Sequence, residues 1–222
     1  MTEQLNRLQQ AERDYYLAQA RSAHQEYEKL VLEELCLRED LAEKQHDRAN
    51  RETRARARRT YDFVGEVTEH EVETAVDELN DWVHRSLEPV TIRLCSPGGS
   101  VFDGFFLYDF LQDVRRQGVF VTTYVLGYGA SMGAVLSQAG DRRLIAKNAW
   151  FMVHEPSTIA LGKAGDIRRE AKLMERIHEQ LSGILAERSS LSLDEVLSRS
   201  SDKDWWMSAQ EALDFGFFDQ LV

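Results

Sequence analysis

The feature of this sequence that most restricts its fold is the alternation of strand-like and helix-like segments from Tyr61 onward. Short runs rich in Val, Thr and aromatic residues are each followed by a turn and a longer segment with apolar residues at helical spacing. This order is typical of an α/β domain with a mainly parallel sheet. Strands are expected at 61–67, 90–95, 119–126 and 149–156, and the longer helices at 102–117 and 166–188.

Local signals predict where several helices begin and end. A serine or threonine followed three residues later by glutamate forms a capping box that opens a helix. A glycine directly after a helical segment closes it, and Gly118 stands in that position after 102–117. The three capping boxes begin at Thr68, Ser192 and Ser208.

The first 60 residues differ in composition from the rest of the chain. Residues 1–60 contain no Gly or Pro and are rich in Gln, Glu, Arg, Ala and Leu, which favours a helix. Mostly apolar side chains recur with a 4-3-4-3 spacing from Tyr16 to Leu41, interrupted by Glu34. We expect a long helix or helical hairpin. Its row of apolar side chains, or seam, either binds a partner or packs against the rest of the same chain. The chain therefore divides into a charged helical arm, 1–60, and a domain, 61–222.

The net charge is unevenly distributed along the chain. Acidic and basic residues balance in the arm, so the whole net charge of −11 belongs to the domain. An acidic domain argues against nucleic acid as the main partner, because phosphate binding needs clustered cations. The arginine-rich run Arg48–Arg59 is the exception, and a solvated helix face or a hinge is a better reading of it than an RNA site.

The cysteines and the hydropathy of the chain indicate the cellular compartment in which the protein is expected. Cys36 and Cys95 lie in different segments and have no metal-ligand spacing, so free thiols in a reducing compartment are expected. The first residues contain no apolar leader, and no apolar stretch approaches the length that spans a membrane. A protein of the cytoplasm, without a membrane partner, is expected.

Three polar segments fall where expected strands end, at the edge of a parallel sheet where functional groups collect. Ser131 lies between glycines after 119–126, SPGG (96–99) follows 90–95, and His154 closes the strand within 149–156. A serine hydroxyl needs a neighbouring base, and histidine has a suitable pKa. Each segment alone has an ordinary structural reading, but their joint occurrence at strand ends favours a nucleophilic serine.

The GASMG segment (129–133) also fits the nucleophile elbow of α/β-hydrolases. That fold needs an acidic residue and then a histidine after the serine. Only His154 and His178 follow Ser131, His178 lies within an expected helix, and the chain has no HGGG-type oxyanion loop. We therefore reject the α/β-hydrolase fold as the leading interpretation.

Several longer segments resemble one family in the order in which they occur. SPGGSVFDGFFLYDFL, GYGASMGAVLSQAG, NAWFMVHEP, ALGKAGDI and DKDWWMSAQEALDFGFFDQLV are similar to the oxyanion turn, nucleophile segment, histidine strand, handle and C-terminal end of the Clp peptidase family. The resemblance covers residues 61–222. It implies a ClpP-like serine endopeptidase with a crotonase-like α/β fold.

The same resemblance implies the roles of three side chains. Ser131 corresponds to the nucleophile and His154 to the general base and later acid. Asp204, in KDWWMS, corresponds to the aspartate that orients the imidazole. The residues alone leave the choice among the aspartates open, and the other candidates are Asp202, Asp194 and Asp166.

The resemblance also implies the groups that would bind substrate. The oxyanion donors would be the backbone N–H groups of Gly99 and Met132, and Gly98 and Gly99 would lie against the substrate backbone. The implied reaction is hydrolysis of a peptide bond without ATP. It needs no cofactor and no metal.

Family members form homo-oligomeric rings, usually stacked in pairs, and cleave polypeptide substrates, in many cases with an AAA+ unfoldase as partner. The arm 1–60 departs from the short pore-loop segment with which the family normally begins. One alternative is therefore a head-maturation protease of a tailed phage, in the host cytoplasm, whose arm binds a scaffold or capsid protein. A second alternative is an inactive, ring-forming interaction protein.

Overall fold

The computed structural model describes residues 34, 37–38, 40–41, 44, 59–201 and 203–222. The chain divides into two units, Met1–Arg54 and Ala55–Val222, and the second unit contains the β-sheet. The described residues of the first unit are helical and exposed, and Arg38 pairs with Glu34 at 2.7 Å. The predicted seam from Tyr16 to Leu41 and the arginine-rich run before residue 59 lie, for the most part, outside the described residues.

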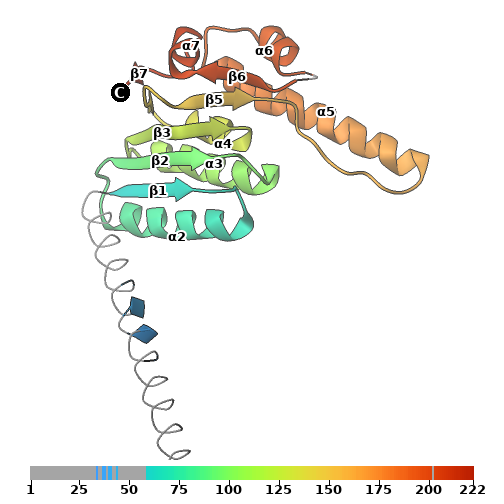
Figure 1. Ribbon diagram of the computed structural model, residues 1–222. Helices are drawn as coiled ribbons and strands as arrows, with labels where there is room; N and C mark the ends of the chain where they lie inside the picture. Colours follow the sequence, from blue (N-terminus) through green and yellow to red (C-terminus); the bar gives the residue numbers. More distant parts are fainter. Residues whose placement is uncertain (1–33, 35–36, 39, 42–43, 45–58, 202) are drawn as a thin grey trace, which may run out of the picture. The chain divides into compact units, whose positions relative to one another are not determined.

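The second unit is an α/β domain built on one mainly parallel sheet, so the predicted fold class is confirmed (Figure 1). All strand pairs are parallel except β5 with β6, which is antiparallel. The strands are β1 (Thr60–Val64), β2 (Val90–Ser96), β3 (Val121–Ala130), β4 (Arg142–Ile145), β5 (Trp150–Val153), β6 (Trp205–Ser208) and β7 (Gln220–Leu221).

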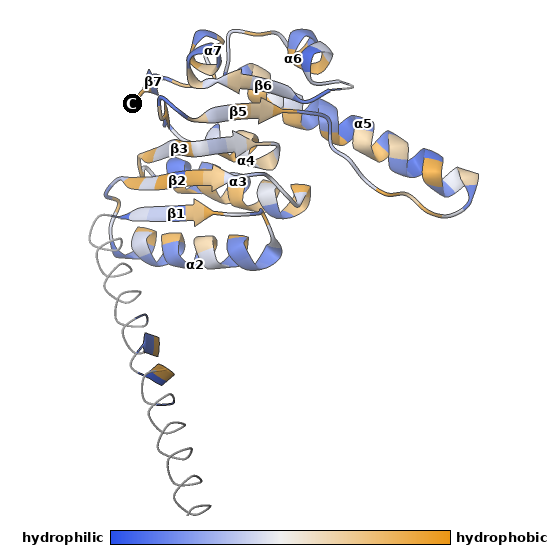
Figure 2. Ribbon diagram, viewed as in Figure 1, coloured by the Kyte–Doolittle hydropathy of each residue, from blue (hydrophilic) through white to orange (hydrophobic). Residues whose placement is uncertain are grey.

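Three helices, α2, α6 and α7, begin where the capping residues predicted. Thr68, Ser192 and Ser208 each accept a hydrogen bond from the backbone N–H three residues later, and the box is reciprocal at the two serines. In Figure 2 the helices carry both hydrophilic residues, in blue, and hydrophobic residues, in orange, as expected for helices with one buried face. The helices are α2 (Glu69–Arg85), α3 (Val101–Arg116), α4 (Met132–Ser137), α5 (Ala164–Glu187), α6 (Leu193–Ser200) and α7 (Ala209–Asp214).

Strand β3 is longer than the predicted segment 119–126 and changes partners along its length. Residues 122–125 pair with β4, whereas residues 128–130 pair with β5. The pairing of β3 with β2 shifts between these two stretches, where Gly127 has a φ of 70°. The sequence GYGA resembles a turn because two of its four residues are glycine, but Gly127 instead bends a strand that continues to Ala130.

Three strands of this sheet, β4, β6 and the two-residue β7, were not predicted. Strand β4 has the sequence RRLI and β6 the sequence WWMS, and neither shows a clear alternation of apolar and polar residues. Both are held by pairing with strands that are distant in sequence, β4 with β3 and β7, and β6 with β5. Their strand conformation is therefore a consequence of tertiary pairing more than of local sequence.

The domain begins before Tyr61, because Arg59 belongs to its buried part. The Arg59 side chain donates to the Trp82 carbonyl at 2.9 Å and to the Ser86 hydroxyl at 2.5 Å, and the residue is 8% exposed. The backbone there has a φ of 47°. Arg59 thus connects the start of β1 to the C-terminal end of α2 through side-chain hydrogen bonds.

Helix α5 has two parts with different surroundings. Its C-terminal half is buried against the domain through Ile177, Leu181 and Leu185, while most of its N-terminal half is exposed. Figure 1 shows the N-terminal half extending past the ends of the strands. In the described part of the chain, no helix combines the length and the apolar character needed to cross a membrane.

Candidate active site

The pairing of β3, β5 and β6 brings three of the predicted site residues together. Ala130 of β3 is the register partner of Met152 in β5, and the next residue, Ser131, donates its backbone N–H to the Met152 carbonyl at 2.9 Å. Across the other edge of β5, Val153 is the register partner of Trp205 in β6. The residue after Val153 is His154, and the residue before Trp205 is Asp204, so these registers place all three side chains at one end of the sheet.

Ser131 has an unusual backbone conformation at the junction of β3 and α4. Its φ is 54° and its ψ is −122°, and apart from Arg59 no other non-glycine residue among those described has a positive φ. Such a conformation is costly for a residue with a side chain and persists only where the surroundings impose it. The N–H bond to Met152 and the close contact with the loop 96–99 supply those constraints.

The side chains of Ser131 and His154 are in direct hydrogen-bond contact. The Nε2 atom of His154 lies 2.8 Å from the Oγ atom of Ser131. The Nδ1 atom of His154 lies 3.4 Å from Oδ1 of Asp204, just beyond the usual hydrogen-bond range of about 2.7–3.2 Å. The imidazole is 26% exposed and the carboxylate 58%, so the aspartate end of the array is open to water.

Asp204 is the aspartate that the geometry places beside His154. Of the other three that the residues left open, Asp166 caps α5 and pairs with Arg169, and Asp194 lies in the first turn of α6. Asp202 lies outside the described residues. The side chain of Asp204 thus faces the imidazole nitrogen opposite the one that contacts Ser131.

The glycine turn 96–99 is pressed against the Ser131–Met132 backbone. The Gly98 carbonyl accepts the Val67 N–H at 2.8 Å, and the turn has left-handed φ values of 95° at Gly98 and 145° at Gly99. A Cβ atom on Gly98 would lie only 2.6 Å from Cβ of Ser131 and 2.9 Å from the Met132 nitrogen. Only glycine fits at this position, because any side chain would force the turn away from the serine.

Two backbone N–H groups near Ser131 are free to receive a negatively charged oxygen. Within the described part of the chain, neither the Gly99 N–H nor the Met132 N–H donates to a protein acceptor. The Met132 N–H is at the first turn of α4, where helical N–H groups have no partner within the helix. These are the two donors that the sequence resemblance implied for an oxyanion.

A cavity of about 420 Å³ opens beside Ser131 and His154. One wall is formed by the turn 96–99 and the start of α3, and another by α4 and the end of β5. The third wall is one face of α5, which the sequence motifs did not predict. The signal for it was present as the spacing of Met174, Ile177, His178, Leu181, Ser182 and Leu185, which places them on a single helical face.

His178 contacts this cavity, but it is held apart from the Ser131–His154 pair. Its Nε2 atom lies 2.9 Å from the hydroxyl of Ser200, which in turn donates to the Val196 carbonyl at 2.8 Å. Burial lowers the pKa of His178, and the effect of nearby Glu155 does not offset it. This histidine is therefore kept neutral and serves as a fixed part of the cavity wall.

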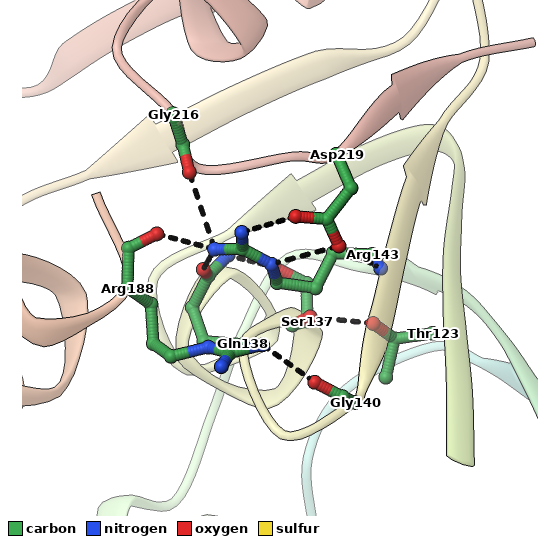
Figure 3. Close-up of polar contacts among 8 residues, drawn as sticks. All are labelled: Thr123, Ser137, Gln138, Gly140, Arg143, Arg188, Gly216 and Asp219. Carbon is green, nitrogen blue, oxygen red and sulfur yellow. Dashed lines mark hydrogen bonds and ion pairs between the residues drawn. The ribbon is translucent and has the colours of Figure 1, made fainter. Parts of the chain in front are cut away.

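A partly buried polar network stabilises the far end of α4 (Figure 3). The Arg143 guanidinium donates to Gln138 at 3.1 Å, to the Gly216 carbonyl at 3.2 Å and to the Arg188 carbonyl, and it pairs with Asp219. Burial alone would raise the pKa of Asp219, but hydrogen bonds from Arg143 outweigh burial and lower it. The network ties α4, which begins at the serine, to the C-terminal ends of α5 and of the chain.

This arrangement defines a class of protein. A serine hydroxyl bonded to a histidine, at the end of a parallel sheet and beside free backbone N–H groups, is typical of serine hydrolases. Among the described residues, no group of three or more His, Cys, Asp or Glu side chains is placed to hold a metal ion.

The chain belongs to the Clp protease family, whose model matches residues 44–222. The match confirms the resemblance inferred from the sequence motifs, and it begins within the segment assigned to the arm. Membership makes this protein a peptidase, a hydrolase whose substrates are polypeptides.

Proposed function

We propose that this protein cleaves peptide bonds with Ser131 as nucleophile, His154 as general base and acid, and Asp204 as the group that orients the imidazole. The observation that carries the proposal is the 2.8 Å contact between Ser131 Oγ and His154 Nε2. It is supported by the backbone of Ser131, which is held at a φ of 54° beside two unpaired N–H groups.

The proposed reaction begins with attack of Ser131 Oγ on the carbonyl carbon of the scissile bond, while its proton passes to His154 Nε2. The negative charge that develops on the carbonyl oxygen is stabilised by the N–H groups of Gly99 and Met132. The C–N bond then breaks as His154 gives the proton to the leaving amine. A water molecule hydrolyses the acyl-serine by the same steps, so hydrolysis itself consumes no ATP.

Labelling with a fluorophosphonate tests the identity of the nucleophile directly. The reagent forms a bond to an activated serine and releases fluoride, whereas an ordinary serine does not react. Peptide mapping of the labelled full-length chain should locate the adduct on Ser131. An unlabelled protein, or an adduct on a different serine, would contradict the proposal.

Asp204→Asn should slow peptide hydrolysis by roughly 100-fold while the fold is retained. An asparagine side chain can place its N–H₂ group toward the imidazole and so favour the tautomer in which Nε2 cannot accept the serine proton. We expect a smaller loss than for a fully buried triad aspartate, because Asp204 is 58% exposed and water can partly replace it. The measurement is kcat/KM on a fluorogenic peptide.

Asp202→Asn provides the matched control for that substitution, since both changes remove one negative charge from the same short segment. We expect Asp202→Asn to keep near-normal turnover. The reverse pattern, with Asp204→Asn harmless and Asp202→Asn damaging, would show that the third residue is misassigned.

We also propose that the protein works as a homo-oligomeric ring in the cytoplasm, and that the arm 1–60 governs assembly, access or the choice of partner. An AAA+ unfoldase is one candidate partner. A scaffold or capsid protein is the alternative if the chain acts as a phage head-maturation protease in the host cytoplasm. The second alternative, an inactive ring-forming protein, is disfavoured by the contact between Ser131 and His154.

Removal of residues 1–54 should leave Ser131 reactive toward a fluorophosphonate and toward short peptides. Every residue of the proposed chemistry lies in the unit Ala55–Val222. This cut also keeps Arg59, whose side chain donates a hydrogen bond to the Trp82 carbonyl of the same unit. We expect the oligomer distribution, or the cleavage of large protein substrates, to change. Size exclusion with light scattering measures the oligomer distribution. Digestion of a folded or unfolded protein such as casein measures the cleavage of large substrates.

Two outcomes with the truncated chain would contradict the proposed role of the arm. If it folds by circular dichroism but its serine no longer reacts, the arm forms part of the active site and the proposed division of roles is wrong. If its assembly and its cleavage of large substrates both match those of the full chain, the arm governs neither assembly nor access.

A further inference from the structure

The carboxylate of Asp204 is held only loosely by its own side-chain contacts. It lies 3.4 Å from Nδ1 of His154 and is 58% exposed, and the described part of the chain offers it no other ion pair. A contact of this length at an exposed site does little to fix the geometry of the two groups. The position of Asp204 therefore depends on the backbone that follows it.

That backbone enters β6, which pairs with β5 alone among the described strands. Trp205, the first residue of β6, is the register partner of Val153, and the residue after Val153 is His154. The backbone at Trp205 thus determines where the preceding carboxylate lies relative to the imidazole. Because the end of a strand with one neighbour opens more easily than a strand flanked on both sides, Trp205 needs further contacts to stay in place.

The side chain of Trp205 makes those contacts with two phenylalanines. Its ring centre lies 5.4 Å from that of Phe215 and 6.0 Å from that of Phe217, both in edge-on geometry. Phe217 is fully buried and lies 5.1 Å from Phe151 of β5. Trp205 is therefore the outer member of an aromatic row that begins in the core of the domain.

Arg199, in the last turn of α6, covers the outer end of this row. Its guanidinium carbon lies 5.3 Å from the ring centre of Trp205 and 5.1 Å from that of Phe215. A cation within about 6 Å of an aromatic ring is attracted to the face of that ring. Arg115 and Arg143 pair with aspartates, whereas Arg199 has no carboxylate within 4 Å among the described residues. The two rings are thus the described contacts of this guanidinium.

We propose that Arg199 is a positioning residue that acts through Trp205 on the Asp204 carboxylate. It holds the Trp205 ring in place, and the Trp205 backbone in turn fixes the carboxylate beside the imidazole. This inference rests on the proposed function, because it takes Asp204 to orient His154. Neither Arg199 nor Trp205 lines the cavity beside the reactive serine, so loss of Arg199 should affect the chemical step and leave substrate binding unchanged.

Arg199→Ala in the full-length protein should lower kcat on a fluorogenic peptide by about tenfold, with a change in KM of less than about twofold. Arg199→Gln, which is also uncharged, should give the same loss, and it takes the place of the alanine variant if that protein does not fold by circular dichroism. Arg199→Lys should stay within about threefold of the wild type, because an ammonium group is also attracted to aromatic rings.

The decisive measurement repeats Arg199→Ala in the Asp204→Asn protein. If Arg199 acts through Asp204, its removal should have no further effect there, because the carboxylate that it positions is already absent. An arginine that only stabilises the fold would lower the rate by the same factor in both proteins. Arg85→Ala is the matched control, since Arg85 also lies in the last turn of a helix, α2, but pairs with Asp81 at 2.9 Å. This control should leave kcat unchanged.

An unchanged kcat in folded Arg199→Ala, or an equal loss with and without Asp204→Asn, would overturn the inference. The loss caused by Asp204→Asn alone and the fluorophosphonate labelling of Ser131 would in that case still support the proposed function. If Asp204→Asn alone had no effect, the proposed role of Asp204 and this inference would both be wrong.

Discussion

Ser131→Ala is expected to lower peptide hydrolysis by roughly a thousandfold or more while leaving the fold and the assembly intact. The substitution removes the oxygen proposed to attack the peptide bond, and members of a catalytic serine–histidine pair act as a unit. It removes no core volume, and alanine meets the same backbone cost as serine at a φ of 54°. The remaining rate would come from His154 and the two N–H groups acting on bound water.

The measurement compares kcat/KM of Ser131→Ala with that of Ser198→Ala, an exposed serine on α6. Ser198→Ala should be indistinguishable from the wild type. Circular dichroism and size exclusion should show the same fold and the same oligomer for all three proteins. If Ser131→Ala kept more than about a tenth of the wild-type turnover, the serine-peptidase mechanism would be wrong.

Gly98→Ala is expected to have the second-largest effect, a loss of about 100-fold or more in kcat/KM. Its Cβ would lie 2.6 Å from Cβ of Ser131 and 2.9 Å from both the Ala130 carbonyl oxygen and the Met132 nitrogen. Two of these three atoms belong to the backbone, so the turn itself must move. That movement separates the Gly99 N–H from the Met132 N–H, and the developing oxyanion can no longer contact both.

Gly65→Ala separates this steric effect from backbone strain. Gly65 also has a left-handed φ, of 120°, but a Cβ there would meet nothing within 4 Å. Both substitutions should destabilise the fold by about 1–2 kcal/mol through the backbone, as measured by urea unfolding. Only Gly98→Ala should also lose activity, and equal activity in the two variants would show that the turn does not position the reacting groups.

Much of the fold followed from signals that act over a few residues. The capping serines at Ser192 and Ser208 and the closing Gly118 marked helix ends correctly, because these residues satisfy backbone groups within the same turn. The alternation of strand-like and helix-like segments was sufficient to predict a mainly parallel sheet. The same reasoning identified Ser131 and His154 as residues at strand ends, and the structure places them 2.8 Å apart.

The tertiary structure decided how those segments meet. The sequence did not show that β3 bends at Gly127 and pairs with both β4 and β5, or that Asp204 precedes a strand antiparallel to β5. It also did not show that α5 forms a wall of the cavity and buries Ser182 there. Strand register depends on packing between residues far apart in the chain, and a slip by one residue would turn each side chain to the opposite face of the sheet. Local patterns therefore identified Ser131 and His154 as candidates, and the pairing of distant strands brought their side chains into contact.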